Sequence, residues 1–361
     1  MLNRWETLFL ILTTVPIMGH VQILPLIYDI AGRDSWIATL FSFPVGLGLI
    51  IAIYRLRHKY PDRDVHGIIH HLLGRFFGKT LLIVIAFYFL FLSAFSAAAI
   101  TDMVNISFFP ETPVWALAIF FLLFCLYAAS KGVKVIAYTA LFIGVFALFT
   151  GHSISFIDVS EKEFNHILPL LEFGFAPVIW GAVALISVWA ELIFLLFLPL
   201  QTIHREHFLR FWIIGGFGIF FTMLSTMTGT VMVFGMGQTD SFNYPALETV
   251  RILTLGFIDR FDIYGLILMS FGCYIRSSLF FLLGYDQFIA FYQGQNRWVR
   301  RGVFWALGLL AGGLTLYIAN NHLRIEYFTM LYTNALIFAP IPFLLLVFSW
   351  FKKKNSKELS V

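Results

Sequence analysis

The sequence predicts an all-α integral membrane protein with about ten transmembrane helices, in a single polytopic domain that covers residues 1–361. Hydrophobic residues make up 60% of the chain and charged residues only 12%, whereas soluble proteins carry about 25% charged residues. A water-soluble fold of this size cannot bury so much apolar surface, so we expect a lipid bilayer to be its solvent.

The apolar runs have the lengths that membrane helices need. A helix requires about 20 residues to cross a hydrocarbon core of roughly 30 Å, and a complete helix satisfies its own backbone groups in lipid. Eight runs carry no charge, and two carry one charge each, Glu191 and Arg276. The predicted spans are roughly 7–28, 35–54, 80–101, 112–130, 135–157, 173–203, 211–239, 263–285, 302–323 and 327–351.

Basic residues alternate from loop to loop and predict the orientation. The side that holds the termini carries 18 of the 24 Lys and Arg residues, the opposite side carries five, and Arg276 lies within a span. The positive-inside rule then places both termini in the cytoplasm of a multi-pass membrane protein. The net charge of +4 is therefore a topology signal, and we expect no nucleic-acid partner. The Lys-rich tail from Lys352 to Lys357 is expected to contact anionic lipid headgroups.

Residues that could carry catalysis or hold a metal are sparse. Cys125 and Cys273 lie inside separate apolar runs and predict no disulfide framework. His66 and His70 are one helical turn apart, but no Cys or carboxylate cluster completes a metal site around them. We therefore expect no catalytic residue, no metal and no cofactor, and the chain is not expected to be an enzyme.

Ten spans divide into five plus five, which suggests an inverted repeat with a site near the midplane. In such folds the first helix of each half is often broken. Pro16 and Gly19 weaken span 1, and the triplet Leu24-Pro25-Leu26 recurs in span 6 as Leu198-Pro199-Leu200. Counting back eight residues from each of these prolines gives Ile17 and Glu191. The alternative is a coincidental tripeptide plus an ordinary proline kink.

Short motifs along the chain resemble those of a known family. They are 19–25, 31–37, Tyr60-Pro61, Leu73-Gly74, Gly78-Lys79, 112–115, Trp189-Ala190-Glu191, 259–262 and Arg276. Together they are similar to the spore germination permeases, the B-subunits of nutrient germinant receptors in the amino acid–polyamine–organocation transporter superfamily. Trp189-Ala190-Glu191 resembles a Phe-Gly-Glu motif of that family, and Arg276 falls where the family often has Lys.

The resemblance implies a LeuT-like 5+5 fold with spans 1 and 6 interrupted around a central pocket. It implies a small nutrient, amino acid-like, as the ligand. It also implies two partners, an A-type membrane subunit and a C-type lipoprotein of a germinant receptor, in the spore inner membrane. Ala190 departs from the family's Gly, and His20 is bulkier than the small residue expected there, so the ligand is expected to differ from those of relatives.

Interrupted helices would expose backbone groups to a ligand. A half-helix N-terminus suits a carboxylate, and open carbonyl groups suit an ammonium. We therefore expect a zwitterionic ligand between the weakened parts of spans 1 and 6, with Trp189 as a lid. The predicted ligand-binding residues are Thr14, Pro16, Gly19, Ser187, Trp189, Ala190 and Glu191.

The two intramembrane charges are the strongest pointers to a site. A carboxylate inside a span costs at least about 2.5 kcal/mol on insertion scales, so Glu191 predicts proton coupling or ligand contact; the alternative is a carboxyl that ties helices together. Arg276, followed by Ser277, could replace a cation between spans 1 and 8. Its alternative is a structural ion pair with Glu191 or a clamp on open carbonyls.

Two functions fit this pattern. The first is a receptor subunit that binds a small nutrient and triggers germination without net transport. The second is a proton-coupled, sodium-independent amino acid transporter. At the outer end of span 3, Asp102 and Asn105 are expected to form a solvated helix end.

Overall fold

The computed structural model describes residues 1–201, 207–253, 261–292, 294 and 296–352. Its regular elements over these residues are all helices. Three predicted segments lie partly outside the described residues: span 6 at 202–203, the motif before span 8 at 259–260, and the tail beyond Lys352. The α-helices are α1 Arg4–Thr14, α2 Pro16–Met18, α3 Leu24–Ala31, α4 Ser35–Lys59, α5 Val65–Ser107, α6 Val114–Lys131, α7 Val133–Ile157, α8 Phe175–Ala190, α9 Phe208–Thr239, α10 Pro245–Arg251, α11 Asp262–Phe291, α12 Arg297–Ala319, α13 His322–Thr333 and α14 Pro340–Phe351.

Among the described residues, nine helical runs are long and apolar enough to cross a membrane. Eight of them each overlap one predicted span. The ninth, Arg4–Lys59, holds 56 residues and contains both predicted spans 1 and 2. At about 1.5 Å per residue, a straight helix of that length would far exceed a bilayer. The chain breaks it at the short 3-10 turn Gly32–Asp34, where Gly32 has a φ of 55°, a backbone conformation that favours glycine.

The weak points predicted in spans 1 and 6 are places where the hydrogen-bond pattern changes. In span 1, α1 ends before Pro16 and a π-helical turn, η1, follows at Gly19–Ile23. In span 6, α8 passes at Glu191 into a 3-10 helix, η5, at Glu191–Leu196. The backbone keeps right-handed helical dihedrals at Val15, Gly19 and Glu191. Both spans therefore change helix type at these points but do not unwind. The 5+5 inverted repeat stays a prediction.

A short helix precedes span 3, because α5 from Val65 to Ser107 is broken at Gly74, where φ is 77° and the backbone is not helical. Span 10 was expected as one helix over 327–351. It consists instead of α13, the 3-10 helix η6 at Asn334–Phe338, and α14, because Pro340 cannot donate to a continuous helix.

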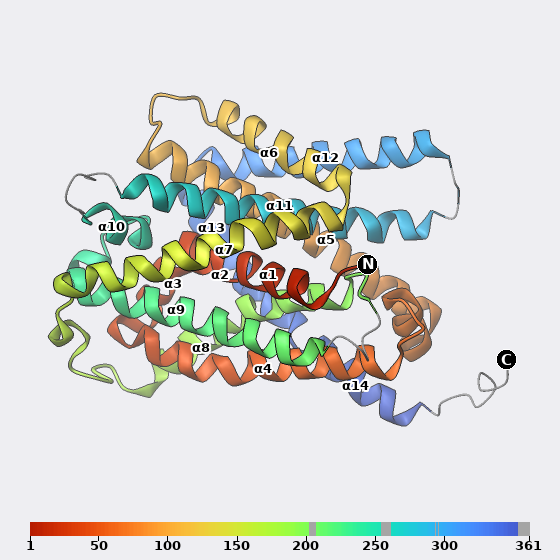
Figure 1. The fold of residues 1–361 in the computed structure, drawn as a ribbon, viewed down its shortest axis with the longest axis horizontal. Helices are drawn as coiled ribbons and strands as arrows, with labels where there is room; N and C mark the ends of the chain where they lie inside the picture. Colours follow the sequence, from red (N-terminus) through yellow and green to blue (C-terminus); the bar gives the residue numbers. More distant parts are fainter. Residues whose placement is uncertain (202–206, 254–260, 293, 295, 353–361) are drawn as a thin grey trace.

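The long helices form a bundle, with the start of α1 and the end of α14 toward one end and α10 at the other (Figure 1). Basic residues predicted for the terminus side do meet at that end. Lys134 contacts Glu6 at 2.7 Å, Lys59 binds the Ser349 carbonyl, and Lys352 binds the His71 carbonyl. These basic residues of the predicted terminus side therefore lie at the same end of the bundle, as the loop-to-loop alternation of Lys and Arg predicts. The assignment of that end to the cytoplasm stays a prediction.

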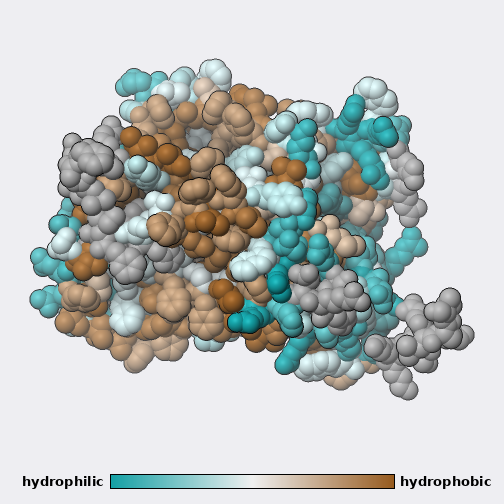
Figure 2. All heavy atoms as spheres, viewed as in Figure 1, coloured by the Kyte–Doolittle hydropathy of each residue, from teal (hydrophilic) through white to brown (hydrophobic). Residues whose placement is uncertain are grey.

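The outer surface of the bundle is apolar. Large side chains stand exposed on several helices, among them Phe142 at 67%, Phe149 at 79% and Leu309 at 77%. Figure 2 shows hydrophobic residues over much of one face, with hydrophilic ones gathered toward the end that holds the N-terminus. Water would penalise such a surface, whereas lipid does not. The chain is therefore a multi-pass membrane protein.

A close helix contact in the core can be tested through Gly46 of α4. A Cβ at Gly46 would lie 2.2 Å from the Trp189 ring of α8, so Gly46→Ala should destabilise the protein by about 1–3 kcal/mol through overpacking. Thermal unfolding in detergent measures this as a lowered midpoint. Gly313→Ala is the matched control, because nothing lies within 4 Å of its Cβ position. An unchanged midpoint for Gly46→Ala would contradict the α4–α8 packing.

Candidate functional site

Glu191 and Arg276 form an ion pair in the centre of the bundle, and both side chains are fully buried. Arg276 Nη2 donates to Glu191 Oε1 at 2.7 Å, and Arg276 Nη1 donates to Glu191 Oε2. Two parallel hydrogen bonds of this kind fix both planar groups and are among the strongest side-chain interactions. The pair joins η5 of span 6 to α11 of span 8.

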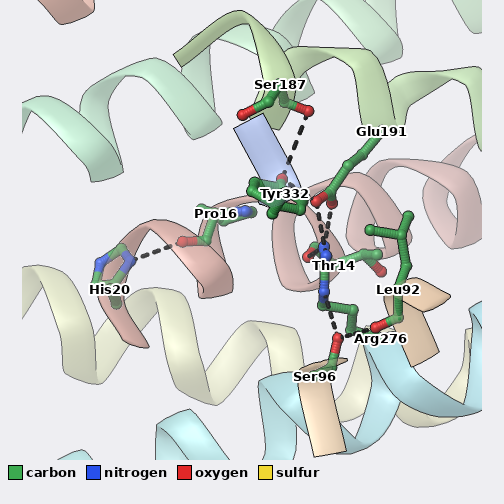
Figure 3. A network of polar contacts seen from close by, with 9 residues as sticks. All are labelled: Thr14, Pro16, His20, Leu92, Ser96, Ser187, Glu191, Arg276 and Tyr332. Atoms are coloured by element: carbon green, nitrogen blue, oxygen red, sulfur yellow. Dashed lines mark hydrogen bonds and ion pairs between the residues drawn. The ribbon is translucent and has the colours of Figure 1, made fainter. Parts of the chain in front are cut away.

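Further groups complete this pair from three other spans (Figure 3). The Tyr332 hydroxyl of α13 donates to Glu191 Oε1. Arg276 Nε donates to Ser96 Oγ of α5 at 2.7 Å, and Nη1 donates to the Thr14 carbonyl of α1 at 3.3 Å. Both alternatives raised for Arg276, an ion pair with Glu191 and a contact with an open carbonyl, are therefore present. Spans 1, 3, 6, 8 and 10 meet at this network.

Two buried hydroxyl groups beside the network have no hydrogen-bond partner within the described part of the chain. They are Thr14 Oγ1 and the Tyr88 hydroxyl. Tyr88 also interacts electrostatically with Glu191 and Arg276. Buried polar atoms in native proteins are nearly always paired with protein or water, so these two hydroxyls are exceptions within the core.

The remaining predicted site residues lie around this centre. Ser277 Oγ donates to the Ser93 carbonyl at 3.0 Å, and Ser93 Oγ donates to the Ser277 carbonyl at 2.8 Å, which clamps α11 to α5. Trp189 is fully buried, and its Nε1 donates to Ser42 Oγ of α4 at 3.1 Å. The Ser187 carbonyl faces the Tyr332 hydroxyl at 3.5 Å.

Gly19 and Ala190 also lie within the interior of the bundle. Gly19 begins the π turn, and a Cβ there would lie 3.3 Å from Met223 of α9. Ala190 is fully buried at the end of α8. Of the predicted residues of spans 1 and 6, Thr14 and Glu191 are linked through Arg276, whereas Gly19 packs against α9 and Trp189 packs against α4.

A cavity of about 190 Å³ lies on the other side of the Pro16 segment. Helices α1, α2, α7, α9, α10 and α11 and the π turn η1 supply its walls. Pro16 is the one member of the predicted ligand set that lines it. His20, which follows on the π turn, donates from Nδ1 to the Pro16 carbonyl at 2.8 Å and meets Thr226 Oγ1 through Nε2 at 2.8 Å.

A second polar network lies near the α10 end of the bundle. Asp102 of α5 accepts from the Tyr244 hydroxyl beside α10 and from His322 Nδ1 of α13, the latter at 2.6 Å. Asp102 is only 4% exposed, so the expectation of a solvated helix end was wrong. Asn105 instead donates to the carbonyls of Phe109 and Thr112 and closes the turn after α5.

Sequence reasoning missed Ser96 and Tyr332, which belong to the central network, and Tyr88, which lies beside it. Each is a hydroxyl-bearing residue in an apolar run. Such residues are common in membrane helices, where they bond their own backbone or a neighbouring helix. A lone serine or tyrosine therefore gives no signal of its partner, which is decided by how distant spans pack.

The hydrogen bond from Tyr332 to Glu191 can be tested by removing a single oxygen atom. Tyr332→Phe should lower the free energy of unfolding by about 2 kcal/mol, because a hydrogen bond to a charged group is lost in a buried site. Tyr317→Phe is the matched control, since Tyr317 is 55% exposed. Thermal unfolding in detergent measures both variants. Equal midpoints for the two would contradict the assigned contact.

Comparison with known proteins identifies relatives over most of the chain. A family model described as "Spore germination protein" matches residues 1–293. Spore germination protein XB of Bacillus anthracis is 27% identical over 289 residues, covering 78% of this chain and 79% of its own length. Spore germination protein YndE of Bacillus subtilis is 25% identical over 338 residues, covering 90% and 89%. With more than half of its length matched, the chain belongs to the spore germination protein family of membrane permeases.

Proposed function

We propose that this protein is the membrane subunit of a spore nutrient germinant receptor, which binds a small nutrient inside the bundle and triggers germination. The observation that carries the proposal is the Glu191–Arg276 network, in which five spans meet at one buried ion pair. Membership of a family of spore germination proteins supports the biological role.

The network offers a way to turn binding into a change of helix packing. Arg276 reaches span 1 through the Thr14 carbonyl, two residues before Pro16. A ligand that displaces the Pro16 segment would remove this acceptor from a buried guanidinium, which is costly unless Arg276 and Glu191 also move. Binding and movement of span 8 are coupled in this way, and the ligand needs only a different affinity for the two packings.

The pairing of the two buried charges limits how an amino acid could bind at the network. An amino acid, as the family resemblance implies, brings an ammonium and a carboxylate into the bundle. Glu191 and Arg276 could serve as their partners only by releasing each other, because each already binds the other. Thr14 Oγ1 and the Tyr88 hydroxyl would supply additional contacts.

The proposed partners are an A-type membrane subunit and a C-type lipoprotein of the same receptor. The family resemblance implies both partners. Relatives are named as spore germination proteins, among them protein KB of Bacillus subtilis at 22% identity over 70% of this chain, which fits a role in germination. The receptor would lie in the spore inner membrane, with both termini of this chain in the cytoplasm.

The alternative is a proton-coupled, sodium-independent amino acid transporter. Arg276 supports sodium independence, because its guanidinium already supplies a positive charge at the Thr14 carbonyl between spans 1 and 8. Proton coupling has less support, since Glu191 is held by Arg276 and Tyr332 together. Accumulation of labelled amino acid in proteoliposomes, driven by a pH gradient, would favour this alternative over a receptor.

The proposed function predicts a selective germination defect. Spores that lack this chain should lose the response to one nutrient in a panel of amino acids, sugars and nucleosides, and keep the response to the others. Spores with Glu191→Gln should show the same loss, because one charge of the pair is left buried without its partner. Glu326→Gln, at a side chain that is 58% exposed, is the matched control and should respond normally.

Loss of absorbance after nutrient addition measures germination, and immunoblotting of spore membranes shows that each variant is present. Deletion spores that respond like the parent to every nutrient would contradict the receptor role. A Glu191→Gln protein that is present and fully responsive would contradict the role of the network.

A further inference from the structure

The cavity beside Pro16 has a lining that differs from the central network. Of the described residues that line it, none is Asp, Glu, Lys or Arg. Its polar groups are hydroxyls and one imidazole, supplied by Thr13, His20, Thr222, Ser225, Thr226, Thr230 and Thr249. The volume of about 190 Å³ equals that of roughly six water molecules at about 30 Å³ each, so the cavity has room for a small solute.

The hydroxyl groups mostly donate to their own helices and keep lone pairs for a ligand. Thr13 Oγ1 donates to the Phe9 carbonyl at 2.7 Å; Thr230 Oγ1 donates to the Thr226 carbonyl at 3.0 Å but already accepts from Thr249 Oγ1 at 3.1 Å. A hydroxyl has one hydrogen and two lone pairs. The lining therefore offers acceptors, which suit a ligand that carries several O–H groups.

The Thr226 hydroxyl has a single hydrogen and two possible acceptors, one of which is His20. His20 Nδ1 faces the Pro16 carbonyl, which can only accept, so Nδ1 carries a proton and Nε2 of the neutral ring is an acceptor. Thr226 has two candidate acceptors, His20 Nε2 at 2.8 Å and the Thr222 carbonyl at 2.9 Å. Whichever acceptor Thr226 leaves is open to a donor hydroxyl from a ligand in the cavity.

We propose that this hydroxyl-lined cavity between α1–α2, α7, α9, α10 and α11 binds the nutrient, and that the nutrient is an uncharged polyhydroxy solute such as a small polyol or monosaccharide. The proposal rests on the proposed receptor function and names its ligand class and site. The described residues of the lining offer no carboxylate for the ammonium group of a zwitterion, and burying that charge is far more costly than burying hydroxyls that find hydrogen-bond partners.

The position of the cavity fits both entry and signalling. Ala246, Thr249 and Val250 of α10 line it, and α10 lies at the end of the bundle away from the N-terminus (Figure 1). Pro16 and Ile275 also line it, and they lie close in the chain to Thr14 and Arg276 of the central network. Figure 3 shows His20 and Pro16 on one side of span 1 and the Glu191–Arg276 pair on the other.

Ligand binding to the purified full-length protein in lipid nanodiscs tests the site. The probes are glycerol, myo-inositol and glucose, with alanine and glutamate as zwitterionic and anionic comparisons, each at low millimolar concentration, below the range in which osmolytes stabilise proteins generally. At least one uncharged probe should raise the unfolding midpoint and the amino acids should not. The proposal would be overturned if only an amino acid shifted the midpoint, or if none of glycerol, myo-inositol and glucose did.

Two variants connect such a shift to the cavity. Thr226→Val keeps the shape of the side chain but removes the hydroxyl that meets His20, and it should weaken binding at least tenfold. Thr222→Val provides a second lining position and should also weaken binding. Thr228→Val is the control, because Thr228 lies on the same helix, donates to the Leu224 carbonyl and does not line the cavity. Wild-type affinity in both lining variants would overturn the site.

Germination of spores separates this inference from the proposed function. If deletion of the chain removes the response to a nutrient, the receptor role holds. If that nutrient is an uncharged polyhydroxy compound, and Thr226→Val raises the concentration needed for half-maximal response while Thr228→Val does not, the cavity assignment holds as well. If the lost nutrient is an amino acid, or Thr226→Val responds like the parent, the cavity assignment fails while the receptor role stands.

Discussion

The buried ion pair of Glu191 and Arg276 is the interaction on which the rest of the structure depends. Taking two charges out of water costs several kcal/mol for each ion, and only good geometry with further hydrogen bonds offsets that cost. Here the geometry is bidentate, and Tyr332, Ser96 and the Thr14 carbonyl supply the further contacts. Five spans must keep their relative positions for all of these bonds to persist, so the pair constrains the whole centre of the bundle.

The irregular parts of the helices serve this centre. The hydrogen-bond pattern of span 1 changes just after Thr14, where α1 ends, and the Thr14 carbonyl accepts from Arg276. The change from α to 3-10 geometry begins at Glu191 itself. The same Pro16 segment forms a wall of the hydroxyl-lined cavity. The cavity and the ion pair thus lie on opposite sides of the Pro16 segment, where the helix of span 1 is interrupted.

Much of this architecture could be predicted because membranes impose simple rules. Apolar run length and the alternation of basic residues located the spans, and all nine candidate helical runs of the described chain fall where runs were expected. A carboxylate and a guanidinium in otherwise uncharged runs pointed to the centre, since lipid makes such residues costly. The family assignment, made from short motifs in order along the chain, is confirmed.

Other features were beyond the reach of the sequence for physical reasons. Asp102 was expected in solvent, but it is buried because Tyr244 and His322, more than 140 positions away, pack over it. The break of span 10 at η6 was also missed. The cavity could not be foreseen, because a void is defined by how several helices pack and not by any one of them. Trp189 was expected as a lid, whereas its ring packs against Gly46 inside the core.

A double-mutant cycle on Glu191 and Arg276 tests the central claim most directly. Glu191→Met and Arg276→Met alone should each lower the free energy of unfolding by about 3–5 kcal/mol, because each leaves one buried charge without a partner. The double variant should be more stable than either single variant, and the exposed pair of Glu248 and Arg251, treated alike, should couple by less than about 1 kcal/mol. Additive losses at Glu191 and Arg276, with no coupling between them, would contradict the account.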